Sequence, residues 1–527
     1  MHAVEAFELV LALLALVIAL YWVALKLKLP PATALLVGGG ALAFVPSLPQ
    51  VALDPELALV LFLPPLLMDG AYSTALGRFR RHLPGILSLA IGAVVFTTLA
   101  VGVVAHWLVP QLPWAACFVL GAIVAPPDAV SARAVLKDIP LPRRLSALLE
   151  GESLLNDATG LILFRFGVAA TLSGVFNAGH AVQSFAIVAI GGVVVGLGMG
   201  ALWVLAAKKL RDRMLIVLST SLLGWAAYLA GEALHVSGVI ATVAAGLVLG
   251  WYQHTVLAAN VRMLGGAFWR ILVFVLEALV FILIGFSLRG AIARIGGVEA
   301  VPAWMILAVA GVVVTITIAR FVWIFGSDIL LMLLRVAGLK RAKPLGWRQA
   351  TVASWAGMRG VVTLAVPLAL PVNMPGRDLM LVCAFAVIFV TVVVQGSSLG
   401  WVIRTVQPVD SEPPAEMDMP ATEFAMARAR TECVEVLAYD EHGELIHPKL
   451  LEEQRRRLAM IERYAANADA AMEMLRPHFD VVLAAIAAAR AELIRLHRAG
   501  LIEDEVLHNL ERDLDVEEMA ITFQREG

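Results

Sequence analysis

The residues best able to do chemistry lie together in one apolar stretch, where Gly151 is followed by Glu-Ser-Leu-Leu-Asn-Asp, ending at Asp157. On a helix Ser153, Asn156 and Asp157 share one face because they are three and four residues apart, and Glu152 lies one turn below Asn156. Carboxylate, hydroxyl and amide oxygens are hard ligands that suit an alkali cation and hold no soft metal. The pattern predicts a site for a dehydrated cation, with a purely structural polar seam between helices as the alternative.

The chain that carries this cluster is more hydrophobic and less charged than a soluble domain. Of 527 residues, 60% are hydrophobic and 16% are charged, against roughly 45–50% and about 25% in soluble domains. Residues 1–407 hold 27 Lys and Arg and 16 Asp and Glu, whereas residues 408–527 hold 13 and 26. This pattern excludes a soluble enzyme or a nucleic-acid-binding protein as the main interpretation. It predicts a polytopic membrane domain at 1–407 and a polar helical domain at 408–527.

Apolar windows of about 20 residues predict an all-α membrane domain of about thirteen transmembrane helices in the lipid bilayer. The expected spans are residues 5–25, 31–46, 55–72, 84–108, 114–137, 145–172, 181–206, 214–231, 235–252, 267–289, 302–334, 347–371 and 378–405. An ionisable residue near the bilayer centre costs at least about 2.5–3.5 kcal/mol. Each charge inside a span is therefore expected to have a partner or a function.

The basic residues of the loops indicate the orientation of the chain. Nineteen Lys and Arg flank one set of alternate loops, and only Arg289, Arg294 and Arg377 flank the opposite set. Because cytoplasmic loops are enriched in Lys and Arg, the N-terminus is expected outside and the C-terminal tail in the cytoplasm. Residues 1–8 hold no Lys or Arg, so the first apolar run is expected to be a spanning helix and not a signal peptide.

Two of the expected spans contain residues that interrupt a helix. Residues 126–128 (Pro-Pro-Asp) lie in the fifth span, where each proline removes a backbone donor, and residues 357–360 (Gly-Met-Arg-Gly) lie in the twelfth. The two spans are seven apart, and this odd offset predicts two inverted six-helix repeats with the seventh span as a connector. Interrupted helices at matching positions point to the binding site of a transporter. Two unrelated kinks are the alternative.

Five motifs together resemble those of a known family. Residues 152–157 (ESLLND) are similar to the ion-binding helix of the monovalent cation:proton antiporter-1 family, the NhaP-type and animal Na⁺/H⁺ exchangers. Residues 126–130 (PPDAV) and 355–361 (WAGMRGV) resemble its two broken helices. Residues 62–69 (FLPPLLMD) and 277–285 (EALVFILIG) resemble two further family stretches. The resemblance implies an NhaA-like antiporter fold with crossing broken helices. The PPDAV motif resembles that of a bacterial subgroup of the family.

The resemblance also implies a role for each residue of the polar cluster. Asp157 would bind the cation and the proton in turn, with Ser153, Asp69 and the backbone at Pro127 completing the Na⁺ site. Asn156 stands where electrogenic relatives carry a second aspartate, which implies electroneutral one-for-one exchange.

Two positions depart from the family pattern. Pro127-Asp128-Ala129 replaces the Thr-Asp-Pro of many members, so a threonine hydroxyl ligand is missing and only the carbonyl of Pro127 could substitute. Asp69 replaces a glutamate and is one methylene shorter. Both differences bear on the coordination shell of the cation and hence on its selectivity.

The remaining family charges are expected to have structural roles. Glu152 and Arg320 match an ion pair that joins the core helices, and a buried pair satisfies charge better than it stabilises. Asp128 and Arg359 would offset the dipoles at the ends of the broken half-helices. Asp128 is also, with Asp69, the next candidate for carrying a proton if Asp157 does not.

The tail has helical periodicity over residues 421–438 and 449–519, interrupted at two glycines and two prolines, Pro477 among them. Apolar residues at helical spacing and Glu–Arg pairs four residues apart predict a small helical bundle or a hairpin that pairs two subunits. Its sequence contains no nucleotide-binding fingerprint, metal motif or catalytic constellation, and a regulatory role and subunit pairing are both open.

We therefore expect a multi-pass antiporter of the cytoplasmic (inner) membrane that exchanges Na⁺ (or Li⁺ or K⁺) for H⁺ by alternating access. No cofactor, enzyme activity or nucleic-acid partner is expected, and the resemblance implies a homodimer. The alternative on the same fold is a proton- or sodium-coupled transporter of an organic solute, which needs a roomier cavity. A cation channel would need a continuous pore ring, and an intramembrane enzyme would need a His-rich or paired-Asp pattern.

Overall fold

The computed structural model describes residues 3–27, 31–42, 55–128, 141–175, 178–295, 297, 302–339, 343–410, 412, 417–465 and 468–526. These residues are mainly α-helical, with one isolated β-bridge between Tyr439 and Leu445. The chain divides into two compact units, Met1–Ser411 (unit 1) and Glu412–Gly527 (unit 2).

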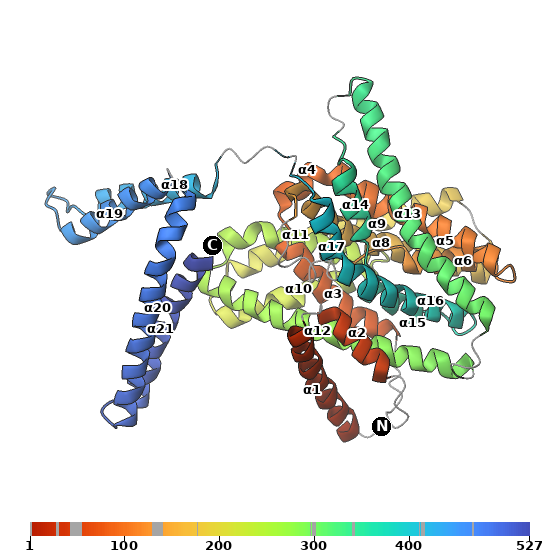
Figure 1. Ribbon diagram of the computed structural model, residues 1–527, viewed down its shortest axis with the longest axis horizontal. Helices are drawn as coiled ribbons and strands as arrows, with labels where there is room; N and C mark the ends of the chain where they lie inside the picture. The colour runs from red at the N-terminus through yellow and green to blue at the C-terminus, as the bar shows by residue number, and fades with distance from the viewer. Residues whose placement is uncertain are drawn as a thin grey trace. The chain divides into compact units, whose positions relative to one another are not determined.

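The helices of unit 1 are drawn in Figure 1. Its first half contains α1 (Ala3–Leu27), α2 (Pro31–Leu42), α3 (Pro55–Ser73), α4 (Leu76–Leu87), the π-helical turn η1 (Ser88–Ala93), α5 (Val94–Leu108), α6 (Trp114–Val124) and α8 (Arg143–Ser173). The chain continues with α9 (Ala178–Ala207), α10 (Arg213–Ala233), α11 (Gly238–Val256), α12 (Ala259–Ile295) and α13 (Ala303–Val336). It ends with α14 (Trp347–Trp355), α15 (Val361–Leu368), α16 (Arg377–Val390), the π-helical turn η3 (Thr391–Gln395) and α17 (Gly396–Val406).

Unit 1 has the surface of a membrane protein. Seven of its described helical segments are long and apolar enough to cross a bilayer, and three shorter ones are apolar. Only 17% of the apolar window of α9 is buried within the chain, and Val182, Ile190 and Leu202 on this helix are exposed. Because such a surface is unfavourable in water and long exposed apolar patches mark interaction with another phase, the chain is a multi-pass membrane protein. The count of thirteen spans and the inverted repeats stay predictions.

Buried apolar side chains form three clusters in unit 1. The largest includes residues of α3, α5, α6, α8, α13, α14 and α16. The second joins α1, α2 and α12, and the third joins α9, α10, α11 and α12. Helix α8 and both interrupted helices therefore belong to one packed body, which fixes their polar residues relative to one another.

Two features of unit 1 differ from the simple picture of spans and loops. Residues 73–83 separate the expected spans 55–72 and 84–108, but Arg78, Arg80 and Arg81 lie on α4. Phe79 and Ile86 of this helix are buried and anchor it. The π-helical turns η1 and η3 each interrupt a longer helix, a feature that is frequent at functional sites.

Unit 2 consists of α18 (Met419–Leu437), α19 (Pro448–Ala465), α20 (Ala468–Arg498) and α21 (Asp504–Glu526). Helices α18 and α19 pack together, as do α20 and α21, and Figure 1 shows both as hairpins. The predicted interruption at Pro477 is wrong, since α20 runs through this residue. Pro477 is exposed, so water can bond the carbonyl that loses its helical partner.

Candidate functional site

Two helices are interrupted where the sequence predicted. Helix α6 ends at Val124, and residues 125–128 continue without helical structure. Helix α14 ends at Trp355, and α15 begins at Val361. The causes are local: consecutive prolines lack the N–H groups that would continue the first helix, and two glycines favour departure from the helix in the second.

The two unwound segments contact one another, and we call this region of contact the crossing. The N–H of Asp128 donates to the carbonyl of Met358 at 2.6 Å. Gly360 lies so close to the Asp128 carboxylate that a Cβ at this position would collide with it. The carboxylate therefore lies beside the N-terminus of α15, where a negative charge is favourable.

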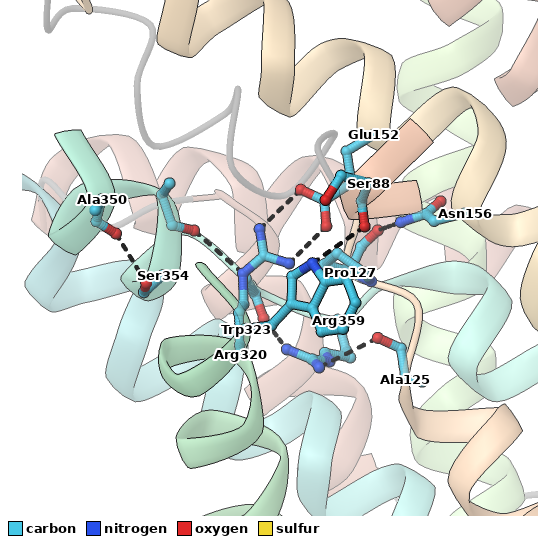
Figure 2. Close-up of polar contacts among 12 residues, drawn as sticks. Ser88, Ala125, Pro127, Glu152, Asn156, Arg320, Trp323, Ala350, Ser354 and Arg359 are labelled. Carbon is cyan, nitrogen blue, oxygen red and sulfur yellow. Dashed lines mark hydrogen bonds and ion pairs between the residues drawn. The ribbon is translucent and has the colours of Figure 1, made fainter. Parts of the chain in front are cut away.

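Arg359 occupies the crossing point and is only 1% exposed. Its guanidinium donates to the carbonyls of Val124 (3.0 Å) and Gly357. It also donates to the carbonyl of Ala125 at 3.2 Å, as Figure 2 shows. These carbonyls follow the C-terminal ends of α6 and α14, where a positive charge is favourable. The N–H of Arg359 donates to Thr391 Oγ1 at 3.1 Å, so η3 also contacts the crossing.

A buried ion pair joins α8 to α13. Arg320 donates to both carboxylate oxygens of Glu152, at 2.6 and 2.8 Å, and to the carbonyl of Ala353 in α14 at 3.1 Å (Figure 2). The two side chains are 3% and 2% exposed. The partners expected from the family resemblance are thus in bidentate contact, which satisfies both charges away from water.

Asn156 ties α8 to the first interruption. Its Nδ2 donates to the carbonyl of Pro127 (Figure 2). The side chain is fully buried, and its Oδ1 has no hydrogen-bond partner among the described residues. The carbonyl of Pro127, which was expected to face the cation, is therefore engaged by the residue that precedes Asp157.

A small cavity of about 50 Å³ lies next to this crossing. Its described lining includes four carboxylate residues and one hydroxyl residue of the polar cluster, namely Asp128, Glu150, Asp157, Glu277 and Ser153. Every charged residue of this lining is a carboxylate. The rest of the lining comes from apolar or small residues and one threonine on or beside α3, α8, α12 and α15. A cavity of this size admits water and its lining favours a cation.

The structure brings together some of the predicted ligands and leaves one apart. Asp157, Ser153 and Asp128 line the cavity, whereas Asp69 is not among its lining residues, although its neighbours Leu66, Leu67 and Gly70 on α3 are. The sequence analysis did not single out two residues of this region, Glu150 and Thr391. Glu150 is three and seven residues from Ser153 and Asp157, a spacing that could have revealed it. Thr391 gave no signal, because its place depends on a π-helical turn.

The described architecture defines a class of protein. A multi-pass helical membrane protein in which two interrupted helices meet beside a cavity lined by carboxylates is typical of secondary transporters. Residues 11–405 match the family model described as the transmembrane part of the sodium/hydrogen exchangers, and the chain belongs to the sodium/hydrogen exchanger family. The family resemblance found in the motifs is thereby confirmed, and membership supports cation/proton antiport.

Individual relatives agree with this assignment. The chain is 33% identical to an uncharacterised Na⁺/H⁺ exchanger of Mycobacterium bovis, over 94% of this chain and 92% of the relative. It is 30% identical to the Na⁺/H⁺ antiporter NhaS2 of Synechocystis, over 77% of this chain and 71% of the relative. Among solved structures, the sodium proton antiporter MjNhaP1 of Methanocaldococcus jannaschii has a TM-score of 0.60 at 18% identity, covering 77% of this chain and 99% of that one. This likeness shows the fold.

Proposed function

We propose that the protein exchanges Na⁺ (or Li⁺ or K⁺) for H⁺, one for one, by alternating access, with Asp157 carrying the cation and the proton in turn. The observation that carries the proposal is the position of Asp157 and Ser153, on one face of α8, in a small cavity beside the crossing of two interrupted helices. Half-helix ends and unwound backbone at a crossing supply partial charges for ion binding.

The proposed Na⁺ ligands are the Asp157 carboxylate and the Ser153 hydroxyl, which both line the cavity. Asp69 and the backbone at Pro127 complete the shell in this proposal, which requires α3 to bring Asp69 into the cavity and the Pro127 carbonyl to accept the cation beside its bond from Asn156. Asp128 is a second proton-carrying candidate. Glu152 with Arg320, and Arg359 with the helix ends, hold the crossing rigid without binding the cation. The contacts support this division of roles, because all three guanidinium nitrogens of each arginine already donate to described partners.

The size of the cavity favours a small cation over the alternative of an organic solute. At about 50 Å³ it is far below the roughly 300–1,000 Å³ of pockets that hold small organic molecules. A bare or partly hydrated alkali cation matches this volume.

The proposed stoichiometry follows from the residues beside Asp157. The Asn156 amide does not titrate, its Nδ2 is bonded to the Pro127 carbonyl, and Glu152 is paired with Arg320. Within residues 152–157, Asp157 is therefore the carboxylate left to bind one proton or one monovalent cation. The two substrates then compete, and the apparent Na⁺ affinity falls as pH falls. At high pH the scarcity of protons slows the return step, so the rate against pH is bell-shaped.

The proposed setting is a homodimer in the cytoplasmic (inner) membrane. The chain would cross it thirteen times as two inverted six-helix repeats, with the N-terminus outside and residues 408–527 in the cytoplasm. The charge bias of the loops supports the orientation, and family resemblance alone supports the dimer.

Dequenching of a ΔpH-sensitive dye in everted membrane vesicles tests the proposal, with Na⁺, Li⁺ and K⁺ added in turn. Wild-type protein should dissipate ΔpH, and Asp157→Asn should abolish the response. Asp378→Asn is the matched control, because this exposed carboxylate pairs with Arg294 outside the cavity. An exchange rate of Asp157→Asn above about a tenth of the wild-type rate would assign the carrier role to Asp128 or Asp69 instead. If the wild type responds to none of the three cations, the proposal is overturned.

Electroneutrality is tested in proteoliposomes with an imposed Na⁺ gradient. Clamping the voltage with valinomycin and K⁺, once K⁺ is excluded as a substrate, should leave the rate unchanged. A Na⁺-driven current would mean that a second carboxylate also carries a proton.

A further inference from the structure

The face of α8 that carries Ser153 and Asp157 carries one more acidic residue, Glu150. It precedes these residues by three and seven positions, so the three side chains follow one line along the helix. All three line the same cavity. Glu150 is half-buried, unlike Glu152 two positions later, which is buried against Arg320.

The carboxylate of Glu150 is held in place by a hydrogen bond. Ser146, one turn earlier on α8, donates its hydroxyl to Glu150 Oε1 at 2.9 Å. Among the described residues no Lys, Arg or His forms an ion pair with Glu150. A positioned carboxylate with a free oxygen and no cationic partner is able to accept a cation.

Glu150 lies at the end of the cavity nearer the start of α8. At 1.5 Å per residue it is about 10 Å along the helix from Asp157. Thr74, which follows the end of α3 between the exposed residues Ser73 and Ala75, lines the cavity as well. The cavity thus extends from Asp157 towards the end of α8 that the loop charges place at the cytoplasmic face.

We propose that Glu150 is a capture residue, a first binding point at which a monovalent cation enters from the cytoplasm before it reaches Asp157. The inference rests on the proposed exchange function and adds a binding step to it. A unit charge about 10 Å from Asp157 changes the affinity for a cation there by between about twofold and about tenfold, depending on the effective dielectric constant. Because this distance is close to the Debye length at about 0.1 M salt, added salt should weaken the effect.

The test is the apparent KM for Na⁺ in everted vesicles, whose outer face corresponds to the cytoplasmic side. Glu150→Gln should raise this KM between about twofold and about tenfold at low ionic strength, with little change in the maximal rate. Raising the ionic strength with choline chloride should reduce the difference. Glu150→Asp keeps the charge and should stay close to wild type, and right-side-out vesicles should show a much smaller effect of Glu150→Gln on KM.

Ser146→Ala separates charge from structure, because it removes the hydrogen bond and leaves the carboxylate. Ser146→Ala should raise KM less than Glu150→Gln does, because the charge stays beside the cavity. If Glu150→Gln leaves KM unchanged at low salt, or raises it as much in right-side-out as in everted vesicles, Glu150 is not a capture residue. Either result leaves the exchange function intact, since wild type would still respond to Na⁺ and Asp157→Asn would not. Absence of wild-type exchange would instead overturn the proposed function itself.

Discussion

At the residue scale, burial and partnership decide what each carboxylate of α8 does. Glu152 is 2% exposed and bound at both oxygens by Arg320, so no lone charge remains to attract a cation. Asp157 and Glu150 line the cavity instead. Three carboxylates of one helix therefore lie in two environments, which supports the structural role proposed for Glu152 and the ion-binding roles proposed for Asp157 and Glu150.

Neutralising one partner of the Glu152–Arg320 pair should destabilise unit 1 severely. Glu152→Gln or Arg320→Met leaves a buried charge unpaired, at a cost of about 3–5 kcal/mol. The double variant should recover part of this loss, because it buries no unpaired charge. Thermal unfolding in detergent measures all three variants.

The exposed pair Arg294–Asp378, with side chains 46% and 41% exposed, is the matched control, and its single neutralisations should cost at most about 1 kcal/mol. A Glu152/Arg320 double variant as unstable as the sum of its singles would mean that the two residues do not interact.

Sequence analysis singled out polar residues of the candidate site, but it did not predict which partners they contact. Asp157 and Ser153 stood out because charges and hydroxyls are rare in apolar spans. That Asn156 binds the carbonyl of Pro127, and that Asp69 does not line the cavity, depend on how α3 and the first break pack against α8. One-dimensional spacing within a helix carries no information about such contacts between helices.

At the element scale, the partial charges of the interrupted helix ends at the crossing are compensated by two side chains, Arg359 and Asp128. Arg359 bonds the carbonyls at the ends of α6 and α14, and Asp128 lies at the start of α15. Both helix breaks were predictable, since Pro-Pro and paired glycines disrupt helices locally. The turns η1 and η3 were not, because a π turn depends on tertiary contacts such as Trp323 Nε1 bonding the Ser88 carbonyl at 3.1 Å.

Gly360→Ala should therefore impair transport strongly. Its Cβ would collide with the Asp128 carboxylate, so either Asp128 or the start of α15 must move, and the cavity lined by Asp128 changes shape. The rate of Na⁺-dependent ΔpH dissipation in everted vesicles should fall at least about tenfold, the equivalent of 1.4 kcal/mol.

The control for this substitution is Gly326→Ala on α13, where an added Cβ meets no atom within 4 Å and alanine favours the helix. This variant should transport like wild type and be as stable or slightly more so. Wild-type rates in Gly360→Ala would show that the crossing adapts without effect on the site.

At the scale of the whole molecule, the chain separates into a unit that holds every proposed ligand and a unit that holds none. The composition indicated a boundary at 407, whereas the compact unit 1 ends at Ser411. The difference has a physical reason. Gln349 Nε2 on α14 donates to the Val409 carbonyl at 2.7 Å, and Arg143 at the start of α8 pairs with Asp410 at 2.7 Å. Polar composition assigned these residues to the tail, but their contacts are with the helices of the site.

Two truncations should therefore behave differently. A chain ending at Ser411 keeps both contacts and should exchange cations for protons at close to the wild-type rate, because unit 2 supplies no proposed ligand. A chain ending at Gln407 should still exchange but be less stable. It leaves the Nε2 group of Gln349, a residue only 2% exposed, without its partner. This loss should lower the free energy of unfolding by about 1–3 kcal/mol. It also loses the part-exposed Arg143–Asp410 pair, which should lower the free energy of unfolding by no more than about 1 kcal/mol.

Thermal unfolding in detergent and ΔpH dissipation in vesicles, normalised to inserted protein, measure the two properties separately. Equal stability of the two chains would mean that residues 408–411 belong functionally to the tail. Loss of all exchange in a well-inserted chain ending at Ser411 would make unit 2 part of the transport machinery.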